Sequence, residues 1–220
     1  MREAYPVFLQ LRGLRCVVVG GGRVATRKVG GLLAVGARVT VVAPEASPEV
    51  QGWAREGRVA WERRPFRPEH LEGAALVFAA TSDREVNGRV AAESAARGVW
   101  VNVADDAEAS GFHVPAVLRR GRLAVAVGTG GASPALAAWV RDRIGELLPA
   151  GLEPLVELAA AVRREGADPE GRRVRELIDA GVLEDLARGD RAEAQRKAAR
   201  ACGGEEHGGE PAQAPSAEAR

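Results

Sequence analysis

The sequence predicts an α/β fold built around a parallel β-sheet, and two observations indicate it. Short runs rich in β-branched apolar residues alternate with longer segments whose apolar residues recur with helical spacing. Continuous apolar runs of this kind are typical of strands that helices cover on both faces. The second observation is a glycine-rich turn that joins the first strand directly to the first helix.

This turn lies within residues 15–36. The apolar run Cys16–Val19 has the composition of a buried strand, and it ends at Gly20. Helical spacing follows after Arg23, with apolar residues at Ala25, Val29, Leu32 and Leu33. We expect this helix to stop at Gly36, because glycine readily adopts the left-handed conformation that ends helices. The segment therefore predicts a strand, a tight turn and a helix.

Gly20, Gly22 and Ala25 fit the pattern G-x-G-x-x-A. In a dinucleotide-binding fold the first glycine allows the sharp turn and the second lets the backbone approach a pyrophosphate. The alanine lets the helix pack close to the strand. The free N–H groups and the positive dipole end of the helix hold the phosphates. An ordinary glycine-rich turn is the alternative, but the flanking strand and helix favour a Rossmann-type domain.

The other strands of the sheet are expected at Arg38–Val42, Val59–Trp61, Ala74–Ala80 and Val99–Val103. Ser47, followed by Pro48, predicts the start of one connecting helix. A capping box of Ser82 and Glu85 predicts the start of another. Ligands of such sheets bind outside the carboxyl ends of the strands. These ends are Gly20–Arg23 (including Gly21), Ala43–Glu45 (including Pro44), Thr81–Asp83 and Asn102–Asp106.

The pattern changes after Asp106. Phe112–Pro115 and Arg122–Val127 are expected to be strands, and Ser133 to cap a helix with an apolar face. That face comprises Leu136, Val140, Ile144 and Leu147. A strand pair and one helix bury too little apolar surface to be stable alone, so we expect this region to pack on a second copy of the chain.

Two features of the same region have an open interpretation. Arg119, Arg120 and Arg122 cluster before a strand, where they either bind substrate carboxylates or form a solvated turn. The loop Gly128–Ser133 is either a second anion-binding loop at a helix start or a plain helix cap. His113 is a candidate ligand or catalytic residue, although a lone histidine is more often structural.

Residues 151–200 are expected to be helical, with a capping box of Asp190 and Glu193 before the last helix. The full prediction is an α/β fold, a Rossmann-type parallel sheet with a small dimerisation region and a carboxyl-terminal helical domain. The boundaries are 1–113 for the NAD-binding domain, 114–149 for the dimerisation region, 150–202 for the helical domain and 203–220 for a disordered tail.

Composition limits the classes of partner. Apolar residues make up 46% of the chain and its net charge is +1, so bulk electrostatics favour neither a nucleic acid nor a membrane surface. No metal-ligand spacing, signal peptide or membrane-spanning apolar run is seen, so we expect no metal site and a cytoplasmic protein.

Residues after the second and fifth expected strands indicate the cofactor and the acid–base group. Glu45 is the acid nearest the second strand end, where a carboxylate binds the ribose hydroxyls of NAD and disfavours NADP. It sits two residues late for this contact, and the alternative is that it belongs to the cap of the next helix. We favour NAD over NADP. Arg23 suits either cofactor. Asp105 and Asp106 follow the fifth strand, beside the expected nicotinamide pocket. One of them, in our interpretation Asp105, accepts a proton while a hydride leaves, unless both merely cap a turn.

Several stretches together resemble one known family. They are Pro6–Leu11, Val18–Lys28, Gly36–Pro44, Ala79–Asp83, Val101–Asp106 and Gly128–Ala137. In this combination and spacing the chain resembles the precorrin-2 dehydrogenase family, which includes the amino-terminal module of siroheme synthase. The resemblance covers roughly residues 5 to 165.

The resemblance implies oxidation of precorrin-2 to sirohydrochlorin with NAD⁺ in siroheme biosynthesis, by a homodimer. Some members also insert ferrous iron, and the macrocycle itself then supplies the metal ligands. Family contacts with the cofactor fall on Arg23, Val24, Pro44 and Glu45, and the family's essential aspartate falls on Asp105. Thr129 stands where some members have a serine, so the resemblance implies no role for it.

Two alternatives stay open at this point. The chain is either a dehydrogenase alone or a dehydrogenase that is also a ferrochelatase. A nucleotide-sensing regulatory module without catalysis uses the same glycine-rich sheet and dimerising appendage. Such a module needs no Asp105, so that residue separates the enzyme from the sensor.

Overall fold

The computed structural model describes residues 4–164 and 171–203. It divides into two compact units. The first comprises the chain up to Ala116 together with Gly128–Ala137, and the second comprises Val117–Val127 and the chain from Ala138 onward. Residues 204–220, on which nearly all of the expected tail falls, lie outside the described residues.

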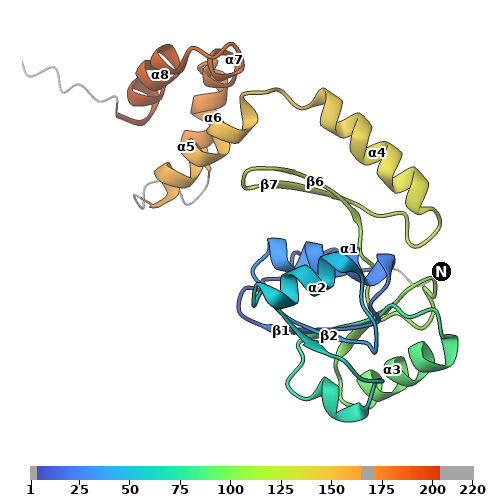
Figure 1. The fold of residues 1–220 in the computed structure, drawn as a ribbon. Helices are drawn as coiled ribbons and strands as arrows, with labels where there is room; N and C mark the ends of the chain where they lie inside the picture. Colours follow the sequence, from blue (N-terminus) through green and yellow to red (C-terminus); the bar gives the residue numbers. More distant parts are fainter. Residues whose placement is uncertain (1–3, 165–170, 204–220) are drawn as a thin grey trace, which may run out of the picture. The chain divides into compact units, whose positions relative to one another are not determined.

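The first unit contains a parallel sheet, as predicted. Its strands are β1 (Arg15–Val19), β2 (Arg38–Val42), β3 (Val59–Glu62), β4 (Leu76–Ala79) and β5 (Trp100–Val103), in the order β3-β2-β1-β4-β5. Strand β1 is central and pairs with β2 and β4 (Figure 1). The run Cys16–Val19 is fully buried because helices cover both faces of the sheet. The carboxyl end of β1 therefore lies between those of its two neighbours.

Three α-helices and one short 3₁₀ helix complete this unit. They are α1 (Arg23–Ala34), α2 (Pro48–Arg55), η1 (Pro68–Leu71) and α3 (Arg84–Ala96). Helix α1 buries Ala25, Val29 and Leu32 against one face of the sheet, which confirms the predicted apolar stripe. Gly36 follows this helix with φ = 75°, and its N–H donates to the Leu33 carbonyl. The expected glycine stop is thereby confirmed.

The starts of α2 and α3 differ in how well the sequence predicted them. Ser47 caps α2 through its hydroxyl, which accepts the Val50 N–H at 3.3 Å, as predicted. The capping box of Ser82 and Glu85 is wrong. Asp83 caps α3 instead, because its carboxylate accepts the N–H of Glu85 at 2.8 Å. A charged acceptor one residue later satisfies these N–H groups better than a serine hydroxyl.

A two-stranded hairpin follows, formed by β6 (Ala116–Arg120) and β7 (Leu123–Val127). The prediction of a strand at Phe112–Pro115 is wrong, since this segment has no regular structure. The Phe112 carbonyl accepts a hydrogen bond from the Asn102 side chain at 3.0 Å, and Pro115 has no N–H to donate to a sheet. Helix α4 (Pro134–Leu147) begins as predicted, with Ser133 accepting the Leu136 N–H at 3.1 Å.

The arginines of the hairpin have structural partners. The Arg120 guanidinium donates to the carbonyls of Gly145 and Leu148, at 2.7 and 2.8 Å, and so caps the carboxyl end of α4. Arg122 pairs with Glu157 at 3.3 Å. Arg120 thus lies in strand β6 and not in the expected solvated turn, and both arginines have partners within the protein, so substrate binding by this cluster stays a prediction.

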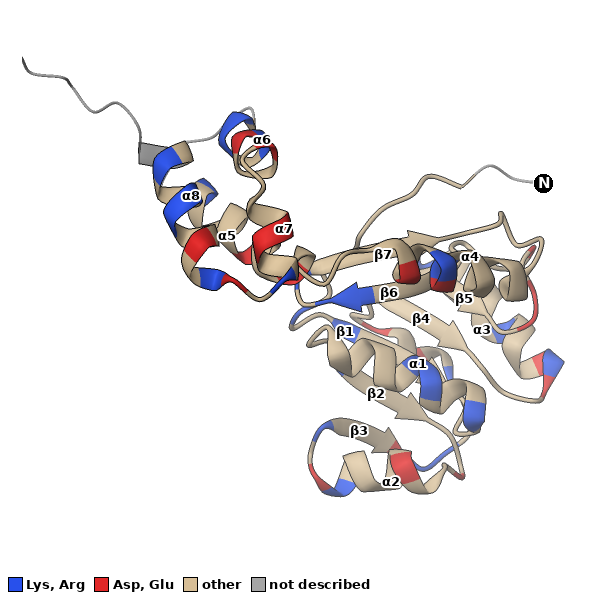
Figure 2. Ribbon diagram, turned by 90° about the horizontal axis from the view of Figure 1, so that it is seen from above, with Lys and Arg blue, Asp and Glu red and all other residues tan. Residues whose placement is uncertain are grey.

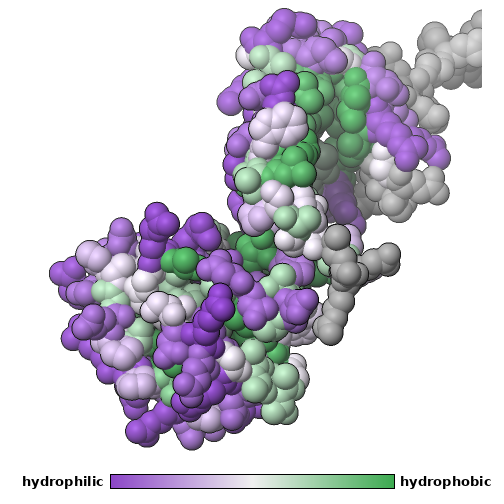
Figure 3. All heavy atoms as spheres, turned by 90° about the vertical axis from the view of Figure 1, so that its right-hand side faces the viewer, coloured by the Kyte–Doolittle hydropathy of each residue, from purple (hydrophilic) through white to green (hydrophobic). Residues whose placement is uncertain are grey.

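Four helices make up the rest of the second unit: α5 (Leu152–Arg164), α6 (Arg172–Asp179), α7 (Val182–Ala187) and α8 (Arg191–Gly203). Their shared core is apolar, and in Figure 3 hydrophobic residues gather between these helices with hydrophilic residues outside. The core residues are Leu155, Val162, Leu177, Val182, Ala194 and Ala198. Lys, Arg, Asp and Glu all occur along these helices (Figure 2).

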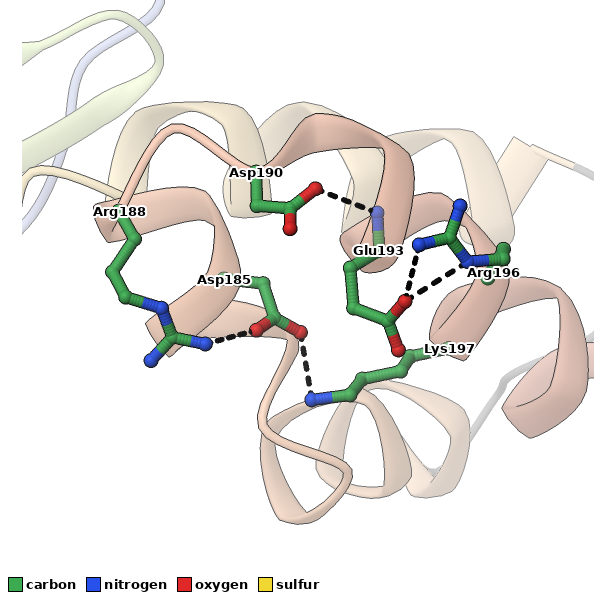
Figure 4. A network of polar contacts seen from close by, with 6 residues as sticks. All are labelled: Asp185, Arg188, Asp190, Glu193, Arg196 and Lys197. Atoms are coloured by element: carbon green, nitrogen blue, oxygen red, sulfur yellow. Dashed lines mark hydrogen bonds and ion pairs between the residues drawn. The ribbon is translucent and has the colours of Figure 1, made fainter.

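One buried carboxylate joins α7 to α8. Asp185 is 1% exposed, and its Oδ2 lies 2.7 Å from the Lys197 ammonium while its other oxygen pairs with Arg188 (Figure 4). The hydrogen bond from Lys197 holds the Asp185 pKa below its usual value, although burial opposes this effect. The predicted capping box before α8 is half correct, because Asp190 accepts the Glu193 N–H whereas the Glu193 carboxylate pairs with Arg196.

No helix in the two described ranges is both long and apolar enough to cross a lipid bilayer.

Replacing Asp185 with asparagine (Asp185→Asn) is expected to lower the midpoint of thermal unfolding by roughly 5 °C or more, because Lys197 loses its buried anionic partner. A carboxylate with a lowered pKa stabilises the fold above its unfolded pKa of about 4, and that stability is lost as the pH falls through its folded pKa. Circular dichroism melts at pH 7 and pH 3 measure both effects. The matched control is Asp142→Asn, which removes an exposed ion pair with Arg141. Equal midpoints for wild type and Asp185→Asn at pH 7 would contradict this account.

Candidate dinucleotide and acid–base site

Two glycines of the turn after β1 are required by the fold itself. Gly20 has φ = 121°, and a Cβ added there would lie 2.3 Å from the Ala80 carbonyl oxygen. A Cβ added at Gly21 would lie 2.0 Å from the Glu45 carbonyl oxygen. Both distances are far below a van der Waals contact, so no side chain fits at either position. The turn is therefore wedged between the backbones that follow β2 and β4.

The third glycine is not required by the fold. Gly22 has φ = −81°, which any residue adopts, and no atom lies within 4 Å of an added Cβ. A glycine at a position with free space and an ordinary backbone fits a site that a ligand approaches closely. Gly22 is the second glycine of the G-x-G-x-x-A fingerprint, and the free space around it would let a pyrophosphate approach the backbone.

The amino end of α1 has no protein partner among the described residues. Gly22 supplies no side-chain cap and the first turn contains no acidic residue. A shallow depression of about 270 Å³ lies here, lined by Arg23, Val24 and Arg27. Free N–H groups, the positive end of the helix dipole and two arginines all favour an anion. These residues therefore fit the phosphates of a dinucleotide.

Hydrogen bonds hold the glycine turn to the segment that follows β2. The Ser47 N–H donates to the Gly21 carbonyl at 2.8 Å, and the Ser47 hydroxyl lies 2.8 Å from that of Thr26. Pro44 and Glu45 are exposed at the same edge. The predicted contacts in the glycine turn and after β2 thus belong to one continuous surface.

Three other expected contact residues have their polar groups engaged within the protein. The Ala43 carbonyl accepts a hydrogen bond from Trp61, and the Thr81 hydroxyl donates to the Asp83 carbonyl. Asn102 is 8% exposed and donates to the Phe112 carbonyl. The side chains of Thr81 and Asn102 therefore shape the loops around the expected site, and their contact with a cofactor stays a prediction.

The structure separates the two aspartates that follow β5. The Asp106 carboxylate accepts the N–H groups of Glu108 and Ala109, at 3.1 and 2.9 Å, so it caps the next turn. Asp105 is exposed and its carboxylate bonds no described residue. It is also the one non-glycine residue with positive φ (61°) in the described ranges. The conformation of Asp105 is one that glycine adopts more easily, and such costs occur most often at functional sites.

Lys28 is a site residue that the sequence interpretation missed. Its ammonium lies 5.4 Å from the centre of the Phe78 ring, which packs edge-on against Phe112. Partial burial lowers the pKa of Lys28, its neighbour Arg27 lowers it further, and the carboxylate of Asp105 acts in the opposite direction. Lys28 and Asp105 therefore lie within electrostatic range of each other. The one available signal was the pair of adjacent basic residues Arg27 and Lys28 in the helix that follows the glycine turn.

The loop before α4 lies beside this region. A Cβ added at Gly131 would be 3.6 Å from the Ala107 side chain and 4.0 Å from the His113 ring. The Thr129 hydroxyl accepts the Ser133 N–H at 3.0 Å, which closes the loop on itself. The helix-cap interpretation of this loop is confirmed, whereas anion binding there stays a prediction. Within residues 4–164 and 171–203, no cluster of three or more His, Cys, Asp or Glu side chains is placed to hold a metal ion.

Comparison with known families agrees with the assignment of a dinucleotide-binding turn. Residues 7–116 match the family described as "Putative NAD(P)-binding". The chain belongs to this family. Residues 120–147 of the NAD(P)-binding chain match a second model, described as "Sirohaem biosynthesis protein central". The observed G-x-G-x-x-A turn is thus the fingerprint of an NAD(P)-binding domain.

Similar proteins confirm the predicted resemblance. The siroheme synthase of Chromobacterium violaceum is 44% identical over 199 residues, and that of Methylobacillus flagellatus is 42% identical over 201 residues. These alignments cover 88% and 89% of this chain but 42% and 43% of the relatives, so the chain spans less than half the length of the curated relatives. The solved structure of "SirC, precorrin-2 dehydrogenase" is 27% identical with a TM-score of 0.71, covering 90% of this chain and all of that one.

Alanine substitutions in the turn are expected to separate folding from cofactor binding. Gly22→Ala places a methyl group in free space, so its unfolding midpoint stays near that of the wild type while its affinity for NAD⁺ falls about tenfold. Gly20→Ala and Gly21→Ala force a methyl group into backbone carbonyls, so both destabilise the protein. Thermal melts and titration calorimetry with NAD⁺ measure the two effects. A Gly22→Ala protein with unchanged affinity would show that the pyrophosphate does not approach this residue.

Proposed function

We propose that this NAD(P)-binding chain catalyses the NAD⁺-dependent oxidation of precorrin-2 to sirohydrochlorin, a step of siroheme biosynthesis. The single observation that carries the proposal is Asp105, an exposed carboxylate without a partner, held in the left-handed conformation at the carboxyl edge of the sheet. The similarity to siroheme synthases and to a precorrin-2 dehydrogenase supports precorrin-2 as the substrate.

The reaction removes a hydride and a proton from the reduced tetrapyrrole. Bound NAD⁺ supplies the hydride acceptor. Asp105 takes the proton that the substrate loses, since its carboxylate is not committed to any hydrogen bond in the fold. Asp106 is the weaker candidate for this role, because its Oδ1 already accepts two backbone N–H groups and ties the carboxylate to the turn.

Cations line the same edge of the first unit. Arg23 and Arg27 lie at the amino end of α1, where they bind the pyrophosphate together with the helix N–H groups. Lys28, which interacts electrostatically with Asp105, provides a positive charge for the carboxylates of the tetrapyrrole. The predicted contacts at Pro44 and Glu45 place the adenosine ribose after β2.

The partner in this proposal is a second copy of the chain. Strands β6 and β7 contain no fully buried residue, and α4 exposes large apolar side chains. Leu136, Trp139 and Leu147 are 51%, 61% and 78% exposed. An apolar helix and hairpin that stay this exposed in one chain support a homodimer formed through β6, β7 and α4.

The substitution Asp105→Asn is expected to lower the rate of precorrin-2 oxidation about 100-fold or more, while the affinity for NAD⁺ stays within twofold of the wild type. Anaerobic absorbance of the sirohydrochlorin product measures the rate, and calorimetry measures NAD⁺ binding. Adding Fe²⁺ to the same cuvette, against a protein-free control, tests iron insertion separately. A sensor module would bind NAD⁺ and give no oxidation even as wild type.

Two control variants sharpen this test. Asp106→Asn keeps an oxygen that accepts the backbone N–H groups, so it should retain activity. Asp105→Gly removes the carboxylate but relieves the backbone, so it should be inactive and at least as stable as the wild type. An active Asp105→Gly protein would contradict the assignment of the base.

The substitution Trp139→Glu is expected to convert the dimer into monomers, because it places a charge in the apolar surface of α4. Light scattering coupled to size-exclusion chromatography at micromolar concentration gives the mass directly. Arg143→Ala, on the same helix but in an exposed ion pair with Glu146, is the matched control and should stay dimeric. A monomeric wild type would refute the homodimer.

A further inference from the structure

Arg63 follows β3 and is stacked on Trp61. The centre of its guanidinium lies 4.1 Å from the centre of the Trp61 ring. The Trp61 indole N–H in turn donates to the Ala43 carbonyl at 3.0 Å, directly after β2. Arg63 is therefore held beside the strand end where a dinucleotide-binding fold distinguishes a ribose hydroxyl from a ribose phosphate.

The charge of Arg63 is not neutralised by a neighbour. Glu62 is the adjacent acid, and its carboxylate pairs with Arg64 at 2.7 Å. Arg63 is exposed, and no carboxylate in the described ranges lies within ion-pairing distance of it. Among the described residues, no group accepts a hydrogen bond from the Arg63 side chain, so its guanidinium N–H groups are free to donate while it lies over the Trp61 ring. Such an arrangement suits the oxygens of a phosphate.

A second arginine–tryptophan pair in the same unit shows that stacking alone does not make this site. Arg58 lies 5.9 Å from the centre of the Trp53 ring, but it pairs with Glu56 at 3.3 Å. It also precedes β3 and so lies at the amino end of that strand, away from the edge that binds ligands. Of these two pairs, only that of Arg63 combines a free charge with the ligand-binding edge.

Two opposite charges consequently flank the expected position of the adenosine ribose. Glu45 follows β2 and suits the two hydroxyls of NAD, whereas Arg63 follows β3 and suits a 2′-phosphate. We propose that Arg63, held on Trp61, binds the 2′-phosphate of NADP, so that this chain uses NADP⁺ as well as NAD⁺. This inference rests on the proposed function only for turnover, because cofactor binding is measured without precorrin-2.

Calorimetry with NAD⁺ and with NADP⁺, on the full chain, tests the inference. We expect the wild type to bind NADP⁺ with a Kd within tenfold of that for NAD⁺. Arg63→Gln should weaken NADP⁺ binding at least tenfold and change NAD⁺ binding less than twofold, because only NADP⁺ loses an ion pair. Arg63→Lys keeps the charge without the planar fork, so its NADP⁺ affinity should lie between the two. Arg58→Gln, the matched control, should leave both affinities unchanged.

Two results would overturn the inference. An Arg63→Gln protein that loses NAD⁺ and NADP⁺ affinity equally would show that Arg63 contacts the adenosine portion common to both. A wild type whose affinity for NADP⁺ is more than tenfold below that for NAD⁺ would show that Glu45 decides the specificity alone. A protein that binds both nucleotides as expected but does not oxidise precorrin-2 would refute the proposed function and leave the assignment of Arg63 supported.

Discussion

The candidate site depends on one constraint, which is the close approach of the Gly20–Gly21 backbone to the segments that follow β2 and β4. Gly20 donates its N–H to the Val42 carbonyl, and the Ala80 N–H donates to Val19, so the turn is tied to β2 on one side and β4 on the other. The absence of side chains at both glycines allows the loops after these strands to meet. This contact fixes the direction of α1, and with it the place where its free N–H groups point.

Asp105, the proposed acid–base group, is positioned by the same sheet but by a different kind of contact. Strand β5 pairs with β4, and the turn beyond it is fixed by Asp106 and by Ser110, whose hydroxyl accepts the Val103 N–H at 2.9 Å. Local hydrogen bonds therefore impose the left-handed conformation of Asp105. One aspartate holds the turn and the other is left free for chemistry.

Much of this arrangement was predictable because it depends on local patterns. The β-branched run before Gly20, the helical spacing of Ala25, Val29 and Leu32, and the glycine stop at Gly36 each report on neighbouring residues. Asp105 and Asp106 carry the same side chain, so only their hydrogen bonds and backbone angles in the structure distinguish them. The Trp61–Ala43 bond and the position of Lys28 over Phe78 join residues far apart in the chain, and no periodicity encodes such contacts. The strand prediction for Phe112–Pro115 was wrong because the Phe112 carbonyl accepts a hydrogen bond from the Asn102 side chain and not from a neighbouring strand.

The charge distribution at the start of α1 has a consequence for the lifetime of the protein. Arg23, Arg27 and Lys28 cluster at the positive end of the helix dipole with no acid in the first turn, so like charges repel there until an anion binds. A nucleotide at 100 times its Kd contributes about 2.7 kcal/mol to the folded state by mass action. Degradation in the cell follows the population of opened molecules, so the abundance of this protein should track the supply of its own cofactor.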